Sequence, residues 1–318
     1  MSLTQTAQRQ ATPAEQAAKP TGYRLFDIQL KRRVALSPSL TRFTFTGPDV
    51  EHMTTLAADQ RIKLLFPTPQ GEPPSLSTNA GWLQAWRTIP LEQRPPMRTY
   101  TIRALRAMQR EVDVEFVLHG ETGPASRWAT HARPGDRLQM VAPNAAYPDD
   151  PGGYEWQPPL QPDHILLIGD ETALPAIAGA LETLKAQGSQ ARIEAFIEVP
   201  VHGDRAELAA PAQSRLHWLI REEQGLGHGD GMLSAAKTLA TLPTHTEPVG
   251  VAEPLADIDI DKQILWELAV PANSAFYAWV AGESAAVMAI RRHWVGELGI
   301  DRSACSFMGY WRMGRVLD

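Results

Sequence analysis

The sequence predicts two domains, an N-terminal antiparallel β-barrel and a C-terminal parallel α/β domain. Three observations predict this class: short strand patterns run to about residue 147, a proline-rich break covers residues 148–162, and strand and helix patterns alternate after it. A chain of 318 residues also suits two hydrophobic cores better than one. We therefore expect a disordered lead over residues 1–20, a barrel over 21–150 and an α/β domain over 163–318.

The composition excludes several classes of protein. Residues 1–20 lack the apolar core of a secretory signal and the chain has no apolar run long enough to span a membrane, so we expect a cytoplasmic protein. The single cysteine, Cys305, excludes an internal disulfide and a thiolate-held metal cluster. The net charge of −6 argues against a nucleic-acid partner, so an anionic ligand requires a local patch of basic residues.

In the first domain, six segments have the alternation or the apolar run of β-strands, with Pro- and Gly-containing turns between them. The expected strands cover residues 23–34, 41–46, 61–66, 99–105, 111–119 and 137–142. The segment 67–95 is rich in Pro, Ser, Thr and Gln, and we expect a long surface loop there with one helical turn near Trp82 and Trp86.

The second domain alternates apolar strand patterns with helical ones, which predicts a parallel sheet with helices on both faces. The expected strands cover residues 164–168, 192–198, 215–221, 276–280 and 304–310, and the expected helices 174–187, 232–242 and 283–299. The stretch 148–162, with five prolines, is expected to be a stiff polar linker.

Residues 98–103, Arg-Thr-Tyr-Thr-Ile-Arg, alternate cationic, hydroxyl and aromatic side chains. On a strand, Arg98 and Tyr100 point to one face, and Thr101 points to the other. A flavin nucleotide needs these groups: a ring that packs on the isoalloxazine, a hydroxyl donor, and cations for the pyrophosphate. The alternative is an ordinary half-exposed strand, because Thr, Tyr and Ile are good strand formers.

A helix is expected to begin at Gly123-Pro124-Ala125-Ser126, where a glycine precedes a proline at the first helical position. Helix N-termini carry free N–H groups and suit a phosphate, and small side chains allow its close approach. A purely structural cap is the other interpretation.

The strand ends of the second domain carry carboxylates where a dinucleotide fold has glycines. Residues 169–175, Gly-Asp-Glu-Thr-Ala-Leu-Pro, contain one glycine and two acids, and this is not a dinucleotide fingerprint, although Thr172 can donate to a phosphate. Glu198 is a candidate for a contact with a ribose hydroxyl, and the alternative is a solvated carboxylate in a turn. Arg192 and Arg221 are candidates for a contact with a 2′-phosphate, and the alternative is that they are ordinary surface residues. Aromatic and basic residues gather after the last strand, at Trp311, Arg312 and Arg315.

Five segments, in this order, resemble the siderophore-interacting protein family of ferric-siderophore reductases, which has a ferredoxin-reductase-like fold. They are residues 98–103, 123–129, 169–175, 279–283 and 309–312. The resemblance implies FAD in the barrel, an NAD(P)H-binding-like second domain, and reduction of siderophore-bound Fe(III) to Fe(II) by a chain that is a monomer. NADPH or NADH is the implied electron donor, and reduced ferredoxin is an alternative.

The resemblance also implies roles for individual residues. Arg98 and Ser126 would hold the flavin phosphates, Tyr100 would pack on the isoalloxazine, and Thr101 would donate near its N5. The implied cofactor-binding residues are Arg98, Tyr100, Thr101, Arg103, Phe116, Val117, His119, Gly123, Ala125, Ser126, Thr172 and Trp311. Candidates for holding an anionic ferric complex are Lys63, Arg127, Arg312 and Arg315. No general acid or base is obligatory for this chemistry, so no catalytic residue is assigned.

One departure from the wider reductase superfamily concerns the donor. Many members have Cys-Gly where the nicotinamide docks, and this chain has Ala281-Gly282-Glu283. Together with Asp170 and Glu171, the substitution predicts weak or unusual NAD(P)H binding.

The sequence leaves three other functions to consider. A different flavin-dependent reductase, acting on a chelate or a quinone, and a ferric-siderophore carrier without turnover both fit parts of the sequence. A metal-dependent hydrolase is disfavoured, because no two of the nine histidines have His-x-x-x-His spacing beside a carboxylate. His228, for example, is expected in a loop far from such a partner, and we expect no metal site.

Overall fold

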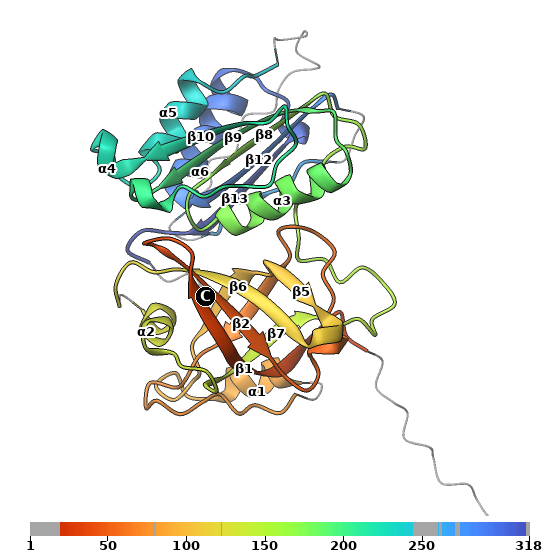
Figure 1. Ribbon diagram of the computed structural model, residues 1–318, viewed down its shortest axis with the longest axis vertical. Coiled ribbons are helices and arrows are strands. Elements are labelled where there is room, and N and C mark those ends of the chain that lie inside the picture. Colours follow the sequence, from red (N-terminus) through yellow and green to blue (C-terminus); the bar gives the residue numbers. More distant parts are fainter. Residues whose placement is uncertain are drawn as a thin grey trace, which may run out of the picture.

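Figure 1 shows the computed structural model, in which an α/β domain lies on a β-barrel. The structure describes residues 20–78, 81–121, 123–243, 260, 263–270 and 274–315. Apart from Pro20, the lead expected over residues 1–20 lies outside these residues. Within them, no helix has the length and the apolar character needed to cross a bilayer.

The first domain is a seven-stranded antiparallel sheet in the order β4-β3-β7-β1-β2-β6-β5. Its two edge strands, β4 and β5, follow each other in the chain, with only Ile102 and Arg103 between them. The sheet must therefore roll up until its edges meet, and the Arg103 N–H donates to the carbonyl of Asp113 in β6 at 2.9 Å. The predicted barrel is confirmed. The strands are β1 (Tyr23–Ala35), β2 (Leu40–Thr46), β3 (Arg61–Leu65), β4 (Met97–Thr101), β5 (Ala104–Arg106), β6 (Glu111–Val117) and β7 (Arg137–Pro143).

An aromatic core fills the barrel. In β6 the side chains alternate, so that Val112, Val114 and Phe116 point inward and acidic residues point outward to arginines. The helix α2 (Pro124–His131) adds Trp128, whose ring lies 5.6 Å from that of Phe43. The expected loop between β3 and β4 contains the helix α1 (Trp82–Thr88), which is longer than the single turn expected there. Elsewhere in this domain, short 3₁₀ helices occupy Val50–His52 and Ala107–Gln109.

The second domain is a six-stranded sheet in the order β10-β9-β8-β12-β13-β11. Five strands are parallel, as predicted, and the two-residue β11 runs antiparallel to β13 at the edge. The expected helix over 283–299 is α-helical only to Arg291 and continues as a π-helix. The elements are β8 (His164–Gly169), α3 (Leu174–Ala186), β9 (Arg192–Val199), η3 (His202–Asp204), β10 (Arg215–Ile220), α4 (Arg221–Gln224), α5 (Asp230–Thr238), β11 (Trp266–Glu267), β12 (Phe276–Glu283), α6 (Ser284–Arg291), η4 (Arg292–Glu297), η5 (Arg302–Ala304) and β13 (Cys305–Trp311).

Alternation in the central strand β8 explains why helices cover both faces of this sheet. Ile165 and Leu167 pack in the core beneath α3, whereas Leu166 and Ile168 pack on the other face with α5 and α6. Because all four side chains are buried, the strand reads in the sequence as a continuous apolar run. This arrangement leaves the carboxyl ends of the parallel strands at one edge.

The segment 148–162, predicted as a stiff polar linker, packs between the two domains. Glu155 and Trp156 are buried. The Glu155 N–H donates to Asp59 of the barrel domain at 3.0 Å, and its carbonyl accepts from the Tyr277 hydroxyl of β12 at 3.1 Å. The backbone of this segment thus bonds to both domains and fixes one against the other.

The last residue of β8, Gly169, leaves no room for a side chain, which gives a test of the packing. A methyl group at Gly169 would lie 2.7 Å from the Ala173 Cβ and 2.9 Å from the Ile177 Cδ1. We expect Gly169→Ala to lower the free energy of unfolding by about 1–3 kcal/mol through overpacking. Gly123→Ala is the control, because nothing lies within 4 Å of a Cβ placed there. Urea unfolding measures both, and equal midpoints would contradict the packing described.

Candidate functional site

A cavity of about 560 Å³ lies between the two domains. The barrel contributes β3, β4 and the start of α2, and the α/β domain contributes the turn after β8 and the segment that ends β13. Most of the residues singled out from the sequence line it. These are Lys63, Arg98, Tyr100, Thr101, Val117, Gly123, Ala125, Ser126, Thr172, Trp311, Arg312 and Arg315.

On the barrel side, four consecutive residues of β4, from Arg98 to Thr101, line the cavity. The Tyr100 ring packs against Phe116 with 4.3 Å between ring centroids, and burial raises the pKa of its phenol, which stays a neutral donor. The Lys63 ammonium on β3 donates to the Thr99 hydroxyl at 3.2 Å. The motif thus presents an aromatic ring beside hydroxyl and cationic groups, as its sequence predicted.

The start of α2 faces the same cavity. The Gly123 N–H donates to the Ser126 hydroxyl at 3.0 Å, and that hydroxyl donates to the Gly123 carbonyl at 3.1 Å. A Cβ at Gly123 would meet no atom within 4 Å, so the surface is open for close approach. The first turn of α2 contains no acidic residue. Free N–H groups, a small N-cap residue and this absence of negative charge suit a phosphate.

Positive charge dominates the cavity wall. Among the residues that the structure describes, five basic residues and one acid, Glu115, line it. Arg61 also bonds Glu155 at 2.8 Å and stacks on Trp266 at 4.4 Å, and Glu115 is held by Arg42. The basic lining residues are Arg61, Lys63, Arg98, Arg312 and Arg315. Such a wall attracts anions in a chain whose net charge is negative.

The cavity fits the flavin dinucleotide expected from residues 98–103 and from the helix start at Gly123. Its volume lies in the range of about 300–1,000 Å³ that is usual for ligand and cofactor pockets. It combines an aromatic wall at Tyr100, a helix start at Gly123 and cations for a pyrophosphate.

Four residues expected at the site do not line the cavity. Phe116 is part of the barrel core, and the guanidinium of Arg103 is bound to Glu182 of α3, with an Nη1–Oε2 distance of 2.9 Å. The His119 Nε2 lies 2.9 Å from a Glu171 oxygen, so His119 joins the two domains. Arg127 is exposed on α2 and lies near Glu121.

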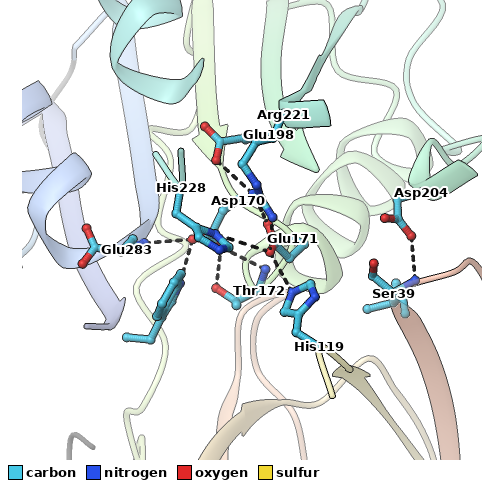
Figure 2. A network of polar contacts seen from close by, with 12 residues as sticks. Ser39, His119, Asp170, Glu171, Thr172, Glu198, Asp204, Arg221, His228 and Glu283 are labelled. Atoms are coloured by element: carbon cyan, nitrogen blue, oxygen red, sulfur yellow. Dashed lines mark hydrogen bonds and ion pairs between the residues drawn. The ribbon is translucent and has the colours of Figure 1, made fainter. Parts of the chain in front are cut away.

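Figure 2 shows that Glu171 lies between Arg221 and His119. Its two oxygens accept from Arg221 at 2.7 Å each. Burial alone would raise the pKa of Glu171, but hydrogen bonds from His119 and Arg221 outweigh it and lower the pKa to about 2. The Glu171 carboxylate is therefore ionised and paired with Arg221, and it does not face the cavity as a free anion.

Three sequence-based alternatives for a nucleotide contact are wrong. Glu198 is wholly buried and accepts from Arg221 at 2.9 Å, so it cannot bind a ribose. Arg221 is buried between Glu171 and Glu198 and is not available to a 2′-phosphate. Arg192 lies at the start of β9, at the opposite edge of the sheet, and is bound to Glu194.

Asp170 fixes the end of β13 against the end of β8. It accepts from the Trp311 indole and from the Glu283 N–H, both at 2.8 Å. Burial and the adjacent charge of Glu171 raise the pKa of Asp170 to about 6. Gly282 leaves room for this carboxyl group: its φ is 149°, and a Cβ there would lie 2.6 Å from an Asp170 oxygen. Trp311 is thereby positioned at the cavity.

The sequence suggested that His228 lies far from a second histidine and a carboxylate, but the structure places it close to both. Its ring lies 5.2 Å from that of Trp311 and 6.3 Å from that of His119, and its Nδ1 is 3.9 Å from a Glu171 oxygen. In the part of the chain that the structure describes, no cluster of His, Cys, Asp and Glu is arranged to hold a metal ion.

Four residues that line the cavity were not singled out from the sequence: Arg61, Glu115, Ile264 and Trp266. Arg61 stacks on Trp266. Arg61 was visible as the first residue of a strand and carried no further signal. Trp266 belongs to a strand of two residues, which is too short to show any periodicity.

Comparison with known proteins gives consistent matches over both domains. Residues 29–147 match the model of the siderophore-interacting FAD-binding domain, and residues 162–314 match that of the siderophore-interacting protein. The chain is 30% identical over 294 residues to the ferric vibriobactin reductase ViuB of Vibrio cholerae, covering 92% of this chain and 90% of ViuB.

Two further matches concern an enzyme and a solved structure. The NADPH-dependent ferric-chelate reductase of Escherichia coli is 28% identical over 207 residues, which cover 64% of this chain and 74% of that protein. The crystal structure of a siderophore utilization protein from T. fusca superposes with a TM-score of 0.70 at 27% identity, covering 93% of this chain and 96% of that one. The expected two-domain, ferredoxin-reductase-like fold and the expected FAD-binding domain are confirmed.

The Glu171 network gives a test by stability. Glu171→Gln should lower the free energy of unfolding at pH 7 by about 3 kcal/mol, because it breaks a buried ion pair. Since the folded-state pKa of Glu171 is depressed, its contribution is present above about pH 4.5 and is lost as the pH falls toward 2. The difference between wild type and variant should therefore shrink below pH 4.5 in urea unfolding.

The matched control for this test is Glu223→Gln, because Glu223 pairs with exposed His202. It should cost less than about 1 kcal/mol. A similar loss in both variants, or a loss for Glu171→Gln that does not depend on pH, would contradict the assigned role of the network.

Proposed function

Because the chain belongs to the siderophore-interacting protein family, we propose that it is an FAD-dependent reductase that converts siderophore-bound Fe(III) to Fe(II). The observation that carries the proposal is the cavity between the domains. One wall has the groups that suit a flavin, and the cations of the same cavity suit an anionic ferric complex.

The proposed electron donor is NADPH or NADH, which is supported by the name of the Escherichia coli relative. Bound FAD would couple a two-electron donor to a one-electron acceptor, so that one NAD(P)H would reduce two ferric ions to Fe(II) and leave oxidised nicotinamide and one proton. Reduced ferredoxin stays an alternative donor, and the cytoplasmic location and the monomeric state stay predictions.

The barrel residues would bind and orient the cofactor. Arg98 would neutralise its phosphates together with the N–H groups at the start of α2, where Ser126 and Gly123 lie. Tyr100, neutral and packed on Phe116, would support the isoalloxazine, and Thr101 would donate to its polar edge. No residue is assigned as an acid or a base.

The mouth of the cavity would hold the ferric complex. Lys63, Arg312 and Arg315 line it from β3 and from the end of the chain after β13, and Trp311 adds an apolar surface. Arg312 also bonds Glu283 at 2.9 Å, which fixes its position. Arg127, on the outside of α2, is left as a candidate only for the outer rim.

The proposed cycle is tested by the visible spectrum of the purified protein under anaerobic conditions. We expect flavin bands near about 380 and 450 nm, bleaching by NADPH or NADH, and recovery of the bands when a ferric siderophore is added. A protein without flavin that FAD cannot reconstitute would contradict the proposal. A flavin that dithionite bleaches but neither nicotinamide does would assign the donor role to a protein such as ferredoxin.

The basic mouth is tested by kinetics. Lys63→Ala and Arg315→Ala should each raise the KM for an anionic ferric siderophore about fivefold at low salt, since one charge at a partly exposed site contributes about 1 kcal/mol. The effect should diminish as salt screens the site. Arg215→Ala is the control, because Arg215 is exposed at the start of β10 and away from the cavity. If Lys63→Ala or Arg315→Ala leaves the KM unchanged, the substituted residue is not part of the substrate site.

A further inference from the structure

The helix α2 begins at the cavity and has only eight residues. An isolated helix of this length is unstable in water, so contacts with the barrel must hold it in place (Figure 1). Its middle is held by Trp128, whose ring lies 6.1 Å from that of the core residue Phe116, and by buried Ala129. Because its first turn lines the cavity, a contact at its last turn is the other way to fix the helix.

Arg33 of β1 makes this contact. Its Nη1 donates to the carbonyls of Ala129, Thr130 and Ala132 at 3.2, 3.0 and 3.5 Å. The last carbonyls of a helix have no partner within the helix, and they carry the negative end of its dipole. A guanidinium placed there satisfies them and stabilises the last turn. Arg33 is thus a cap for α2 that another element supplies.

The direction of Arg33 results from an irregularity in β1. Leu30 lies opposite the core residue Phe45 of β2, and strict alternation after Leu30 would place Arg32 on the same face. The register shifts before Arg32, however, so that Arg33 lies opposite the core residue Phe43. Arg32 instead bonds an acidic residue of β6 on the outside of the barrel. Since opposite residues share a face, the shift turns Arg33, and not Arg32, toward α2.

We propose that Arg33 is a positioning residue for the flavin, because its cap on the last turn of α2 preorganises the N–H groups of the first turn that bind the phosphates. The inference rests on the proposed function, in which FAD occupies the cavity. Arg33 does not touch the cofactor, since eight helical residues span about 12 Å. A ligand that meets an ordered helix start does not have to order that helix as it binds, and its affinity is higher for that reason.

The affinity for FAD tests the role of Arg33. FAD is titrated into the flavin-free protein, and its fluorescence reports binding. Arg33→Met should weaken binding about fivefold, the scale of a cation at a helix C-terminus, and Arg33→Lys should bind nearly as wild type because it keeps a charged donor. Arg32→Met is the matched control and should bind as wild type does, since Arg32 faces away from α2. Melting temperatures show that all the variants are folded.

Riboflavin separates the phosphate site from the rest of the cavity, because it has the same ring system and no phosphate. Arg33→Met should bind riboflavin as tightly as wild type does, so that the loss is specific to FAD. An equal loss for FAD and riboflavin would show a general change in the cavity and would overturn the inference.

Amide hydrogen exchange tests the cap without any ligand. In the flavin-free protein, the N–H groups of Arg127 and Ala132, which bond the Gly123 and Trp128 carbonyls, should exchange several-fold faster in Arg33→Met than in wild type. Added FAD should slow this exchange again, and Arg32→Met should match wild type throughout. Equal exchange in Arg33→Met and wild type would mean that Arg33 does not order α2, and the inference would be wrong.

The outcomes separate this inference from the proposed function. If wild type and Arg33→Met bind FAD equally and a nicotinamide bleaches the flavin of both, the positioning role is wrong and the function stands. If the wild-type protein does not bind FAD, the proposed function is wrong and the inference fails with it.

Discussion

A carboxylate that is buried between two domains has to be matched by positive charge or hydrogen bonds, and Glu171 meets this requirement from both sides. Arg221 of the α/β domain and His119 of the barrel domain bond the same oxygen. The turn after β8 is thereby fixed against the barrel, and Thr172 in that turn reaches the cavity. The pairing also connects Glu198 to the same arginine. Because breaking such a buried pair is costly, the position of the two domains and the shape of the cavity depend on it.

Other polar groups also form contacts between the two domains. Arg103, which joins β4 to β5 where the barrel closes, bonds Glu182 of α3. Asp204 of the α/β domain accepts from the Ser39 N–H of the barrel at 2.8 Å, as Figure 2 shows. The linker adds backbone bonds to both sides. These polar contacts join the domains together with an apolar cluster in which Leu40 of the barrel packs against the α/β core.

Much of the fold could be predicted from the sequence, because period-two alternation and apolar runs follow directly from which faces are buried. The motif at residues 98–103 and the helix start at Gly123 likewise carried local signals, and both line the cavity. The pairs that assemble the site could not be predicted in this way. Arg103 and Glu182 are 79 residues apart, and Arg221 and Glu171 are 50 apart, so no local pattern reports them. For that reason the sequence left Glu198 open between a ribose contact and a solvated turn, and Arg221 between a 2′-phosphate contact and the surface, whereas the two residues are buried and bond each other.

The close approach of Gly282 to Asp170 has a consequence for how related sequences can differ. A side chain at position 282 would occupy the space of the Asp170 carboxyl group, which in turn holds the Trp311 indole. A relative with any larger residue at 282 must therefore have a smaller residue at 170 or a rebuilt turn, and its terminal aromatic residue would lose this anchor. We therefore expect these three positions to change together among related sequences, because a larger residue at one of them does not fit the other two.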